Sequence, residues 1–237
     1  MKKTWKKAVL EALERTRGIK NETLTEKDIQ HLPAIVRKYI RYSGSIGKEK
    51  VLNFRVEFTG GMRSSSSEDF MPLTSVQYNF TDQPTRLFYI VAKKKGIPAK
   101  GIHIYKDRMA FMLIKILGLF TVVDARGKEM DQGETVTVFN DMCFMAPASL
   151  IDRNIEWKEI DDLTVGAKFT NGNITVGATL YFNEDGQLVN FLSNDRFETK
   201  DGKRVEDEVN IMDVVAAPSY KLAESFGCSL LLTICKQ

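Results

Sequence analysis

Residues 51–59 have the sequence VLNFRVEFT, and this stretch decides the fold because its hydrophobicity alternates from one residue to the next. A strand places successive side chains on opposite faces of a sheet, so a period of two separates a core-facing set from an outward-facing set. The core-facing set is Leu52, Phe54, Val56 and Phe58. The outward-facing set is Asn53, Arg55, Glu57 and Thr59. We therefore expect a half-buried strand whose first set is buried and whose second set is exposed or paired with polar groups.

Further segments after this strand have similar character and are joined by short, turn-forming sequences. Asn171-Gly172 and Glu184-Asp185-Gly186 have the turn chemistry of hairpin connections. Parallel strands need crossovers of a dozen or more residues, so these short connections favour antiparallel pairing. The sequence therefore predicts an α+β protein that is mainly β and is built on a curled antiparallel sheet. Its additional strands are expected at residues 72–80, 86–92, 101–106, 110–117, 154–160, 165–170, 174–182 and 187–197.

Two amphipathic helices are predicted before the sheet. Apolar residues at helical spacing predict the first helix over residues 4–16 and the second over residues 33–42, with Gly44 as its end. Thr25 and Asp28 have the spacing of a capped turn before the second helix. A helical insertion is expected near residues 131–151, with its helix at 132–142. The stripe of the first helix consists of Trp5, Ala8, Val9, Ala12 and Leu13.

Length and composition indicate a single domain over residues 1–237. The chain has 237 residues, of which 43% are hydrophobic and 27% charged, and all-β domains commonly reach this size. Within it we distinguish N-terminal helices at 1–45, the curled sheet at 46–210 and an atypical tail at 211–237.

Charge and cysteine usage exclude several classes of protein. The net charge is only +3, and basic residues concentrate locally only at residues 2–7 and 93–95, which is too weak a pattern for nucleic-acid binding. Three cysteines without a CxxC pair and two histidines indicate neither a disulfide framework nor a metal site. The basic N-terminus lacks the apolar region of a signal peptide, and no run is long enough to span a membrane. We expect a cytoplasmic protein without cofactor or metal, and the oligomeric state stays open.

Three stretches of the sequence resemble a family of uncharacterised bacterial proteins. They are LPAIVRKYIRYSG at 32–44, EDFMPLTSVQYNF at 68–80 and MLIKILGLFTVVDARGKEMDQGE at 112–134, and the similarity extends over residues 32–197. The resemblance implies a domain of unknown function with a lipoprotein-carrier type of fold, a half-barrel whose curved sheet surrounds apolar space. The tail 211–237 does not resemble the family's continuation. We expect it to be truncated, diverged or frame-shifted, so that the sheet is short of strands and has an exposed edge.

A dense polar cluster follows the apolar run at 110–123. Carboxylates beside apolar surface suit acid-base chemistry, and this is the basis for one alternative, an enzyme acting on a small amphiphilic molecule at the rim of the sheet. In the structural alternative, Asp124 and Arg126 form a local ion pair and Asp131 caps the helix that follows. We favour the structural role, because carboxylates are common in a first helical turn and paired acidic and basic residues occur in structural networks as well as in active sites. Its members are Asp124, Arg126, Glu129, Asp131 and Glu134.

Apolar residues around the same region are candidates for ligand binding. A sheet strand with two apolar faces must cover something, and flexible Met and Phe side chains suit adaptable binding of apolar molecules. The principal functional prediction is therefore a module that binds a lipid-like or other apolar ligand in the concave face of the sheet. A thicker core, with the helical insertion filling the concavity, and a protein-interaction role for the sheet edge are the other possibilities. The candidate ligand contacts are Met112, Ile114, Ile116, Phe120, Phe139, Met142 and Phe144.

The remaining reactive side chains have no partner pattern in the sequence. His31 precedes the second helix, His103 lies in a strand-like stretch, and neither has ligand-spaced neighbours. Cys143 is flanked by Met and Phe residues, which is typical of a buried small hydrophobe. We assign no catalytic residue.

Overall fold

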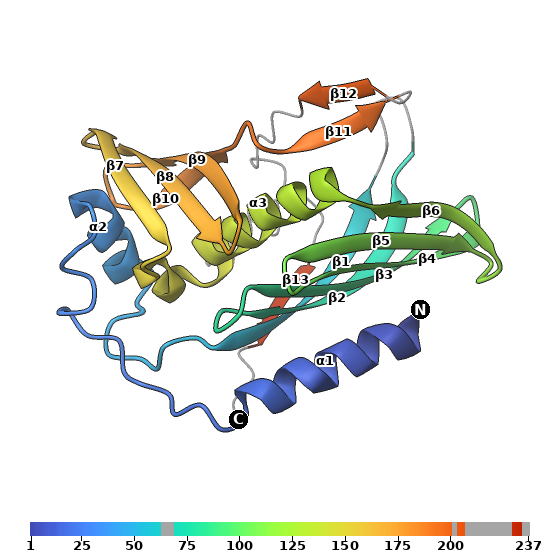
Figure 1. The fold of residues 1–237 in the computed structure, drawn as a ribbon, viewed down its shortest axis with the longest axis horizontal. Coiled ribbons are helices and arrows are strands. Elements are labelled where there is room, and N and C mark those ends of the chain that lie inside the picture. The colour runs from blue at the N-terminus through green and yellow to red at the C-terminus, as the bar shows by residue number, and fades with distance from the viewer. Residues whose placement is uncertain (63–68, 201–202, 207–228, 234–237) are drawn as a thin grey trace. The chain divides into compact units, whose positions relative to one another are not determined.

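A computed structural model describes residues 1–62, 69–200, 203–206 and 229–233 of the chain (Figure 1). Its contacts divide the chain into two compact units whose segments alternate along the sequence. The first unit contains Met1–Ile19, Leu52–Asp131 and Ser219–Gln237, and the second contains Lys20–Val51 and Gln132–Pro218. The predicted single domain over 1–237 stays a prediction, and each unit is described by itself.

The first unit is one helix and an antiparallel sheet. In its described residues α1 (Lys2–Thr16) precedes a meander in which each strand pairs with the next, and β13 (Ser229–Thr233) pairs with β1 at the other side (Figure 1). The sheet order is β13-β1-β2-β3-β4-β5-β6, and it does not close into a barrel. The meander strands are β1 (Asn53–Met62), β2 (Met71–Phe80), β3 (Thr85–Lys94), β4 (Ile97–Lys106), β5 (Met109–Ile116) and β6 (Phe120–Arg126).

Two tight turns of the meander use left-handed backbone conformations at both central residues. Lys95 and Gly96 join β3 to β4 with φ of 49° and 80°, and Asp107 and Arg108 join β4 to β5 with φ of 55° and 64°. Turns of this kind match the right-handed twist of the flanking strands, which explains why successive strands pair so regularly.

The edge strand β6 corrects one expectation. The sequence predicts a strand at 110–117 and, after the apolar run at 110–123, a polar cluster and no further strand before the helical insertion. Instead the chain turns back at Leu117–Leu119, and Asp124 and Arg126 lie inside β6, paired with Leu113 and Phe111 of β5. The segment FTVVDAR has no alternation of apolar and polar residues, because an edge strand with little burial on either face needs none.

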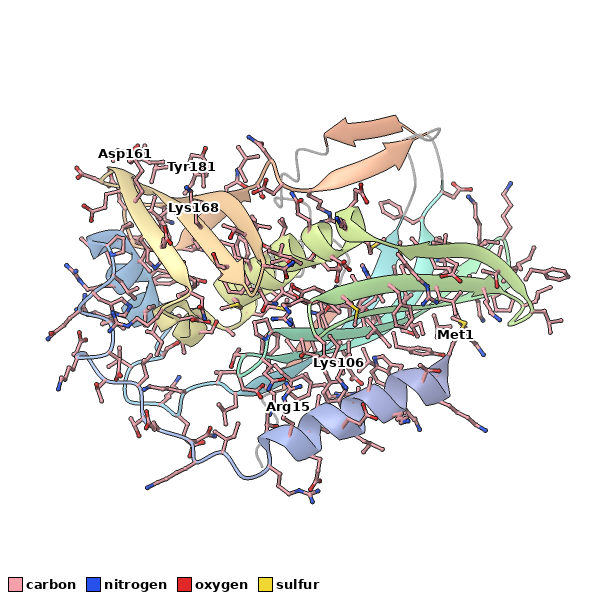
Figure 2. The ribbon with its side chains drawn as sticks, in the orientation of Figure 1. Met1, Arg15, Lys106, Asp161, Lys168 and Tyr181 are labelled. Atoms are coloured by element: carbon pink, nitrogen blue, oxygen red, sulfur yellow. The ribbon has the colours of Figure 1, made fainter. Side chains whose placement is uncertain are left out.

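Helix α1 packs on one face of this sheet through the predicted apolar stripe. Trp5, Val9 and Ala12 are buried against side chains of β2, β3 and β4, and the indole N–H of Trp5 donates to the carbonyl oxygen of Leu87 at 2.9 Å. Arg15, which is labelled in Figure 2, lies at the other end of the helix and donates two hydrogen bonds to Asp82, at 2.7 and 2.9 Å. The predicted first helix is thereby confirmed. The sheet residues of this core are Phe80, Leu87, Tyr89, Ile102 and Ile104.

Strand β1 has the two faces predicted from its period of two. Phe54 and Val56 are 1% and 0% exposed, while Leu52 and Phe58 are half-buried. The polar set lies on the face that α1 covers, because Arg55 and Tyr78 are directly paired and Tyr78 packs against Trp5. Asn53 is therefore buried, and its side-chain amide donates to the hydroxyl of Thr16 on α1 at 3.4 Å.

The second unit combines two helices with a four-stranded antiparallel sheet in the order β10-β9-β8-β7. The helices are α2 (Ala34–Tyr42) and, from Gln132 onward, α3 (Lys128–Met145), which is followed by a short 3₁₀ helix at Pro147–Ile151. The strand predicted at 187–197 is in fact interrupted, since β10 ends at Leu192 and β11 begins at Phe197. The strands are β7 (Ile155–Asp161), β8 (Thr164–Asn171), β9 (Ile174–Phe182), β10 (Leu188–Leu192), β11 (Phe197–Lys200) and β12 (Lys203–Glu206), the last two forming a separate pair.

Aromatic rings form the centre of the second core. Phe139 of α3 stacks on Phe169 of β8, with ring centroids 5.2 Å apart, and meets the edge of Phe191 of β10 at 5.6 Å. Tyr39 of α2 packs against Phe182 and donates its hydroxyl to the carbonyl oxygen of Cys143 at 2.7 Å. Apolar residues of α2 and α3 thus meet on the buried face of this sheet.

The loop before α2 contains the predicted turn. Thr25 donates through its hydroxyl and its backbone N–H to one oxygen of Asp28, at 2.6 and 2.8 Å, and Lys50 donates to the other oxygen at 3.1 Å. These bonds, those from Thr25 above all, lower the pKa of Asp28 to about 2. Gly44 has the positive φ of 67° that ends α2.

Most of the predicted tail 211–237 lies outside the described residues. Within it, residues Ser229–Thr233 form β13 and pair with β1 from Arg55 to Thr59, so the tail adds one strand to the sheet. No helix of the described residues is long and apolar enough to cross a bilayer.

Candidate functional site

A cleft of about 350 Å³ lies in the first unit, beside the N-terminal half of α1. Helix and sheet both contribute to it, because its lining comes from α1 and from β1, β2 and β3. The volume is within the range of small-molecule sites, which is about 300–1,000 Å³. The cleft is lined by Lys2, Trp5, Arg55, Thr74, Ser75, Val76, Tyr78, Tyr89 and Val91.

Three aromatic rings form the apolar part of the cleft. The ring of Trp5 meets Tyr78 edge-on, with centroids 5.8 Å apart and planes at 61°, and lies 5.6 Å from the ring of Tyr89. The hydrogen bond from Trp5 to Leu87 holds the indole in place. Burial raises the pKa of Tyr89, so its phenol stays neutral at physiological pH. The wall therefore presents an oriented indole and a neutral Tyr89 phenol to the cleft.

Two cations lie over these rings. The ammonium of Lys2 is 5.7 Å from the centroid of Tyr89, and the guanidinium of Arg55 is 5.8 Å from that of Tyr78. Arg55 also forms an ion pair with Glu57, two residues along β1, whereas no carboxylate of the described residues pairs with Lys2. Cation–π contacts and the nearby apolar surface keep the positive groups beside the cleft.

The backbone register explains how these groups meet. Arg55 is paired with Tyr78, and Val76 with Tyr89, so alternate residues of β1, β2 and β3 project from the face that α1 covers. On helix α1, Lys2 and Trp5 are three residues apart and therefore lie on the same face, which is the face that packs on the sheet. The arrangement can hold an apolar body against the rings and a negative group against the cations.

A hydrogen-bonded polar chain lies on the opposite face of the same sheet. Arg86 donates to the side-chain oxygen of Gln77 at 2.8 Å, and Gln77 donates to Asn79 at 2.7 Å. Gln77 and Asn79 are buried, and the Arg86 guanidinium lies 4.9 Å from the centre of the Phe88 ring. These bonds satisfy the buried polar groups of Gln77 and Asn79, so the three polar side chains have a structural role.

The predicted polar cluster is distributed over different elements. Arg126 donates to Asp124 at 3.0 Å on β6, where both side chains are exposed, and the guanidinium of Arg126 covers the ring of Phe111. Glu129 is exposed in the first turn of α3, and Glu134 is buried in the part of α3 that belongs to the second unit. The local ion pair of the structural alternative is thus present.

Asp131 has a different partner from the one predicted. Helix α3 begins at Lys128, so Asp131 lies within the first turn and does not precede the helix. Its carboxylate accepts the backbone N–H of Ala110 on β5 at 2.6 Å. Ala110 comes one residue before Phe111, whose partner Arg126 ends β6, so the carboxylate continues the hydrogen bonding of β5 beyond the end of β6.

Replacing Asp131 by alanine is expected to lower the free energy of unfolding by about 1–2 kcal/mol, because the partly buried N–H of Ala110 loses its acceptor. Urea denaturation followed by circular dichroism measures this change. Glu129→Ala is the control, since Glu129 is an exposed acid in the same helical turn. An equal loss in both variants would mean that the helix dipole, and not the bond to β5, is responsible.

The seven predicted ligand contacts fall into two groups. Met112, Ile114, Ile116 and Phe120 share the face of β5 and β6 that points away from α1, and Phe120 is 64% exposed. The other three, Phe139, Met142 and Phe144, are buried in the second unit, where Phe139 belongs to the aromatic core. This packing favours a core role for the second group. Ligand binding by either group stays a prediction.

The histidines and Cys143 show no catalytic arrangement in the part of the chain that is described. Burial and the nearby Arg153 lower the pKa of His31, and burial raises that of the Cys143 thiol, which makes the thiolate scarce. No three His, Cys, Asp or Glu residues among those described gather at a common point as metal ligands would.

The cleft residues were missed as a site by sequence reasoning, although each carried a signal. Trp5 was recognised as part of an apolar stripe, Lys2 as part of a basic segment and Arg55 as part of a polar strand face. Tyr78 and Tyr89 were recognised only as members of the predicted strands at 72–80 and 86–92. What the sequence lacks is the information that one face of the sheet receives α1.

Comparison with known proteins places most of the chain in a family. Residues 22–218 match a family of unknown function (DUF6544). No curated protein matches the chain. The matched segment contains Arg55, Tyr78 and Tyr89 of the cleft, whereas Lys2 and Trp5 precede it. Because the match spans far more than half of the sequence, and agrees with the resemblance of residues 32–197, the chain belongs to this family of unknown function.

Proposed function

We propose that the protein binds a small amphipathic anion in the cleft beside α1. The observation that carries the proposal is the combination of three aromatic rings with two cations, Lys2 and Arg55, around one cleft of about 350 Å³. Small-molecule sites have this composition, with an apolar lining and a few polar groups that fix the orientation of the ligand.

The ligand class follows from the chemistry of the lining. An aliphatic or flat apolar body packs on the rings of Trp5, Tyr78 and Tyr89, and a carboxylate or similar group binds the ammonium of Lys2. Arg55 is partly neutralised by Glu57, so Lys2 supplies most of the positive charge. The proposal keeps the lipid-like ligand expected from sequence, but assigns it to the cleft instead of to the seven residues predicted as its contacts.

The enzyme alternative has less support. Its carboxylates are engaged in structural contacts, Asp124 with Arg126 and Asp131 with the N–H of Ala110. We also propose a cytoplasmic location, because three cysteines without a CxxC pair suit a reducing compartment.

Isothermal titration calorimetry with decanoate tests the proposal, with decanol and decyltrimethylammonium as neutral and cationic analogues. Decanoate is expected to bind best of the three. Lys2→Gln should weaken its binding by about three- to tenfold, the effect of losing one charge-assisted contact. Lys3→Gln is the matched control, because Lys3 is an exposed neighbour on α1 that does not line the cleft.

Two outcomes would contradict the proposal. One is equal binding of all three probes, which would mean that the cations do not select the ligand. The other is loss of binding in Met112→Thr with Lys2→Gln unaffected, since Met112 lies on the opposite face of the sheet. That second result would place the ligand at the β5–β6 face.

A further inference from the structure

One end of the first-unit sheet carries a group of water-exposed apolar side chains, here named the apolar tip. It comprises the start of β4, the turn between β5 and β6, and the start of β6. The N–H of Leu117 donates to the carbonyl oxygen of Pro98 at 2.9 Å, so the two segments are held together. The tip residues and their exposed fractions are Ile97 49%, Leu117 55%, Leu119 76%, Phe120 64% and Val122 52%.

Stability of the fold does not explain these residues. Leu117 has a φ of +53° and is followed by Gly118 at +74°, a left-handed pair for which turns ordinarily use Asn or Gly. A leucine in this conformation opposes folding, and its exposure to water opposes it further. Exposed apolar residues that destabilise the fold at a turn indicate that the turn contacts an apolar surface outside the protein.

Lysines surround the apolar tip. Lys93, Lys94 and Lys95 lead into the β3–β4 turn, and Lys100 and Lys115 are paired across β4 and β5. The N-terminus of α1 lies toward the same end of the sheet as the β5–β6 turn (Figure 1), and Met1, which precedes the helix, is labelled in Figure 2. Lys2 touches Tyr89 and lines the cleft with Val91, two residues before Lys93. Lys2 and the lysines at 93–95, which lie far apart in the sequence, are therefore at the same end of the sheet as the tip.

We propose that the apolar tip and its lysines form a docking surface for an anionic lipid bilayer. Exposed Leu, Ile and Phe side chains enter the boundary between head groups and acyl chains, while lysines bind the negative head groups. The charge around the tip complements such a surface: among the described residues, its nearest carboxylate on β6, Asp124, is already paired with Arg126. This inference goes beyond the proposed ligand binding and does not depend on it.

Co-sedimentation with vesicles tests the docking surface, using phosphatidylcholine alone and phosphatidylcholine with about one quarter phosphatidylglycerol. Binding is expected only to the anionic vesicles and should decline at high salt. Replacing Leu119 and Phe120 by aspartate should reduce the partition coefficient by at least about tenfold, because both apolar contacts are lost. Replacing Lys93 and Lys95 by glutamine should reduce it about fivefold for each lysine.

Matched variants separate the docking surface from general effects. Leu10→Asp changes an exposed leucine of α1, 67% exposed, and Lys158→Gln with Lys168→Gln changes two exposed lysines of the second unit. Both should bind vesicles like the parent protein, and circular dichroism should show every variant folded. Equal binding to neutral vesicles, or an equal loss in the Leu10 variant, would overturn the proposal. A third result would also overturn it. If the parent protein does not bind vesicles, and sedimentation velocity shows that it is a dimer while the tip variant is a monomer, the tip joins two copies of the chain.

Discussion

Replacing Trp5 by alanine is expected to lower the free energy of unfolding by about 3–5 kcal/mol. The indole is 7% exposed, contacts Tyr78 and Tyr89, and donates to the carbonyl oxygen of Leu87. Its removal leaves a cavity between α1 and the sheet and takes away the partner of that carbonyl. The cleft loses its wall at the same time, so binding of decanoate should disappear together with stability.

Urea denaturation followed by circular dichroism measures the loss, and Leu10→Ala is the control. Leu10 is on the same helix but 67% exposed, so its truncation should change stability by less than about 0.5 kcal/mol. Trp5→Phe should restore much of the packing without the hydrogen bond. A Trp5→Ala protein as stable as the Leu10 variant would mean that α1 is not bound to the sheet as described.

The tryptophans also provide a test of the single-domain prediction. The chain has two, Trp5 in the first unit and Trp157 in the second. In Trp5→Phe, fluorescence reports on the second unit, and in Trp157→Phe it reports on the first. Within each variant, a fluorescence transition that coincides with the transition followed by circular dichroism would indicate one cooperative domain, and separate transitions two.

Replacing Phe139 by alanine is expected to cost about 3–5 kcal/mol of unfolding free energy in the second unit. The ring is 0% exposed, stacks on Phe169 and meets the edge of Phe191. Replacing a core residue lowers the free energy of unfolding even when no ligand is present. Replacing a residue that only contacts a ligand mainly lowers the affinity for that ligand. The substitution therefore separates the two roles that the sequence leaves open for Phe139.

The measurement is urea denaturation with and without decanoate. Ile160→Ala serves as the control, because Ile160 is 55% exposed on β7 of the same unit and its truncation should cost little. Phe139→Leu should retain part of the stability lost in the alanine variant. An alanine variant that is fully stable but no longer binds decanoate would assign Phe139 to the ligand site.

Local patterns were sufficient where a feature depends on neighbours in sequence. The alternation at 51–59 predicted the burial of Phe54 and Val56, and the helical spacing of Trp5, Val9 and Ala12 predicted the buried stripe of α1. The bond between Thr25 and Asp28 was also foreseen, because it joins groups three residues apart. The two helices and the antiparallel pairing were expected for the same reason.

Long-range contacts were not accessible in the same way. Asp131 was expected to cap its own helix, but its carboxylate accepts the N–H of Ala110, 21 residues earlier. Strand β6 was missed because an exposed edge strand has no buried face to impose a period of two. The sequence also gives no sign of which strands belong to which of the two compact units.

The sequence by itself determined which residues of each segment are apolar and at what period, and hence that the chain is mainly β with amphipathic helices. Only the tertiary structure decided which face of the sheet α1 covers, and therefore that Lys2, Trp5 and Arg55 share one cleft. It also decided that Lys2 and the lysines at 93–95 lie at the same end of the sheet as Leu117 and Phe120. The physical reason is that periodicity records burial within one element, whereas the meeting of distant elements depends on strand register and helix placement, which arise only when the whole core is packed.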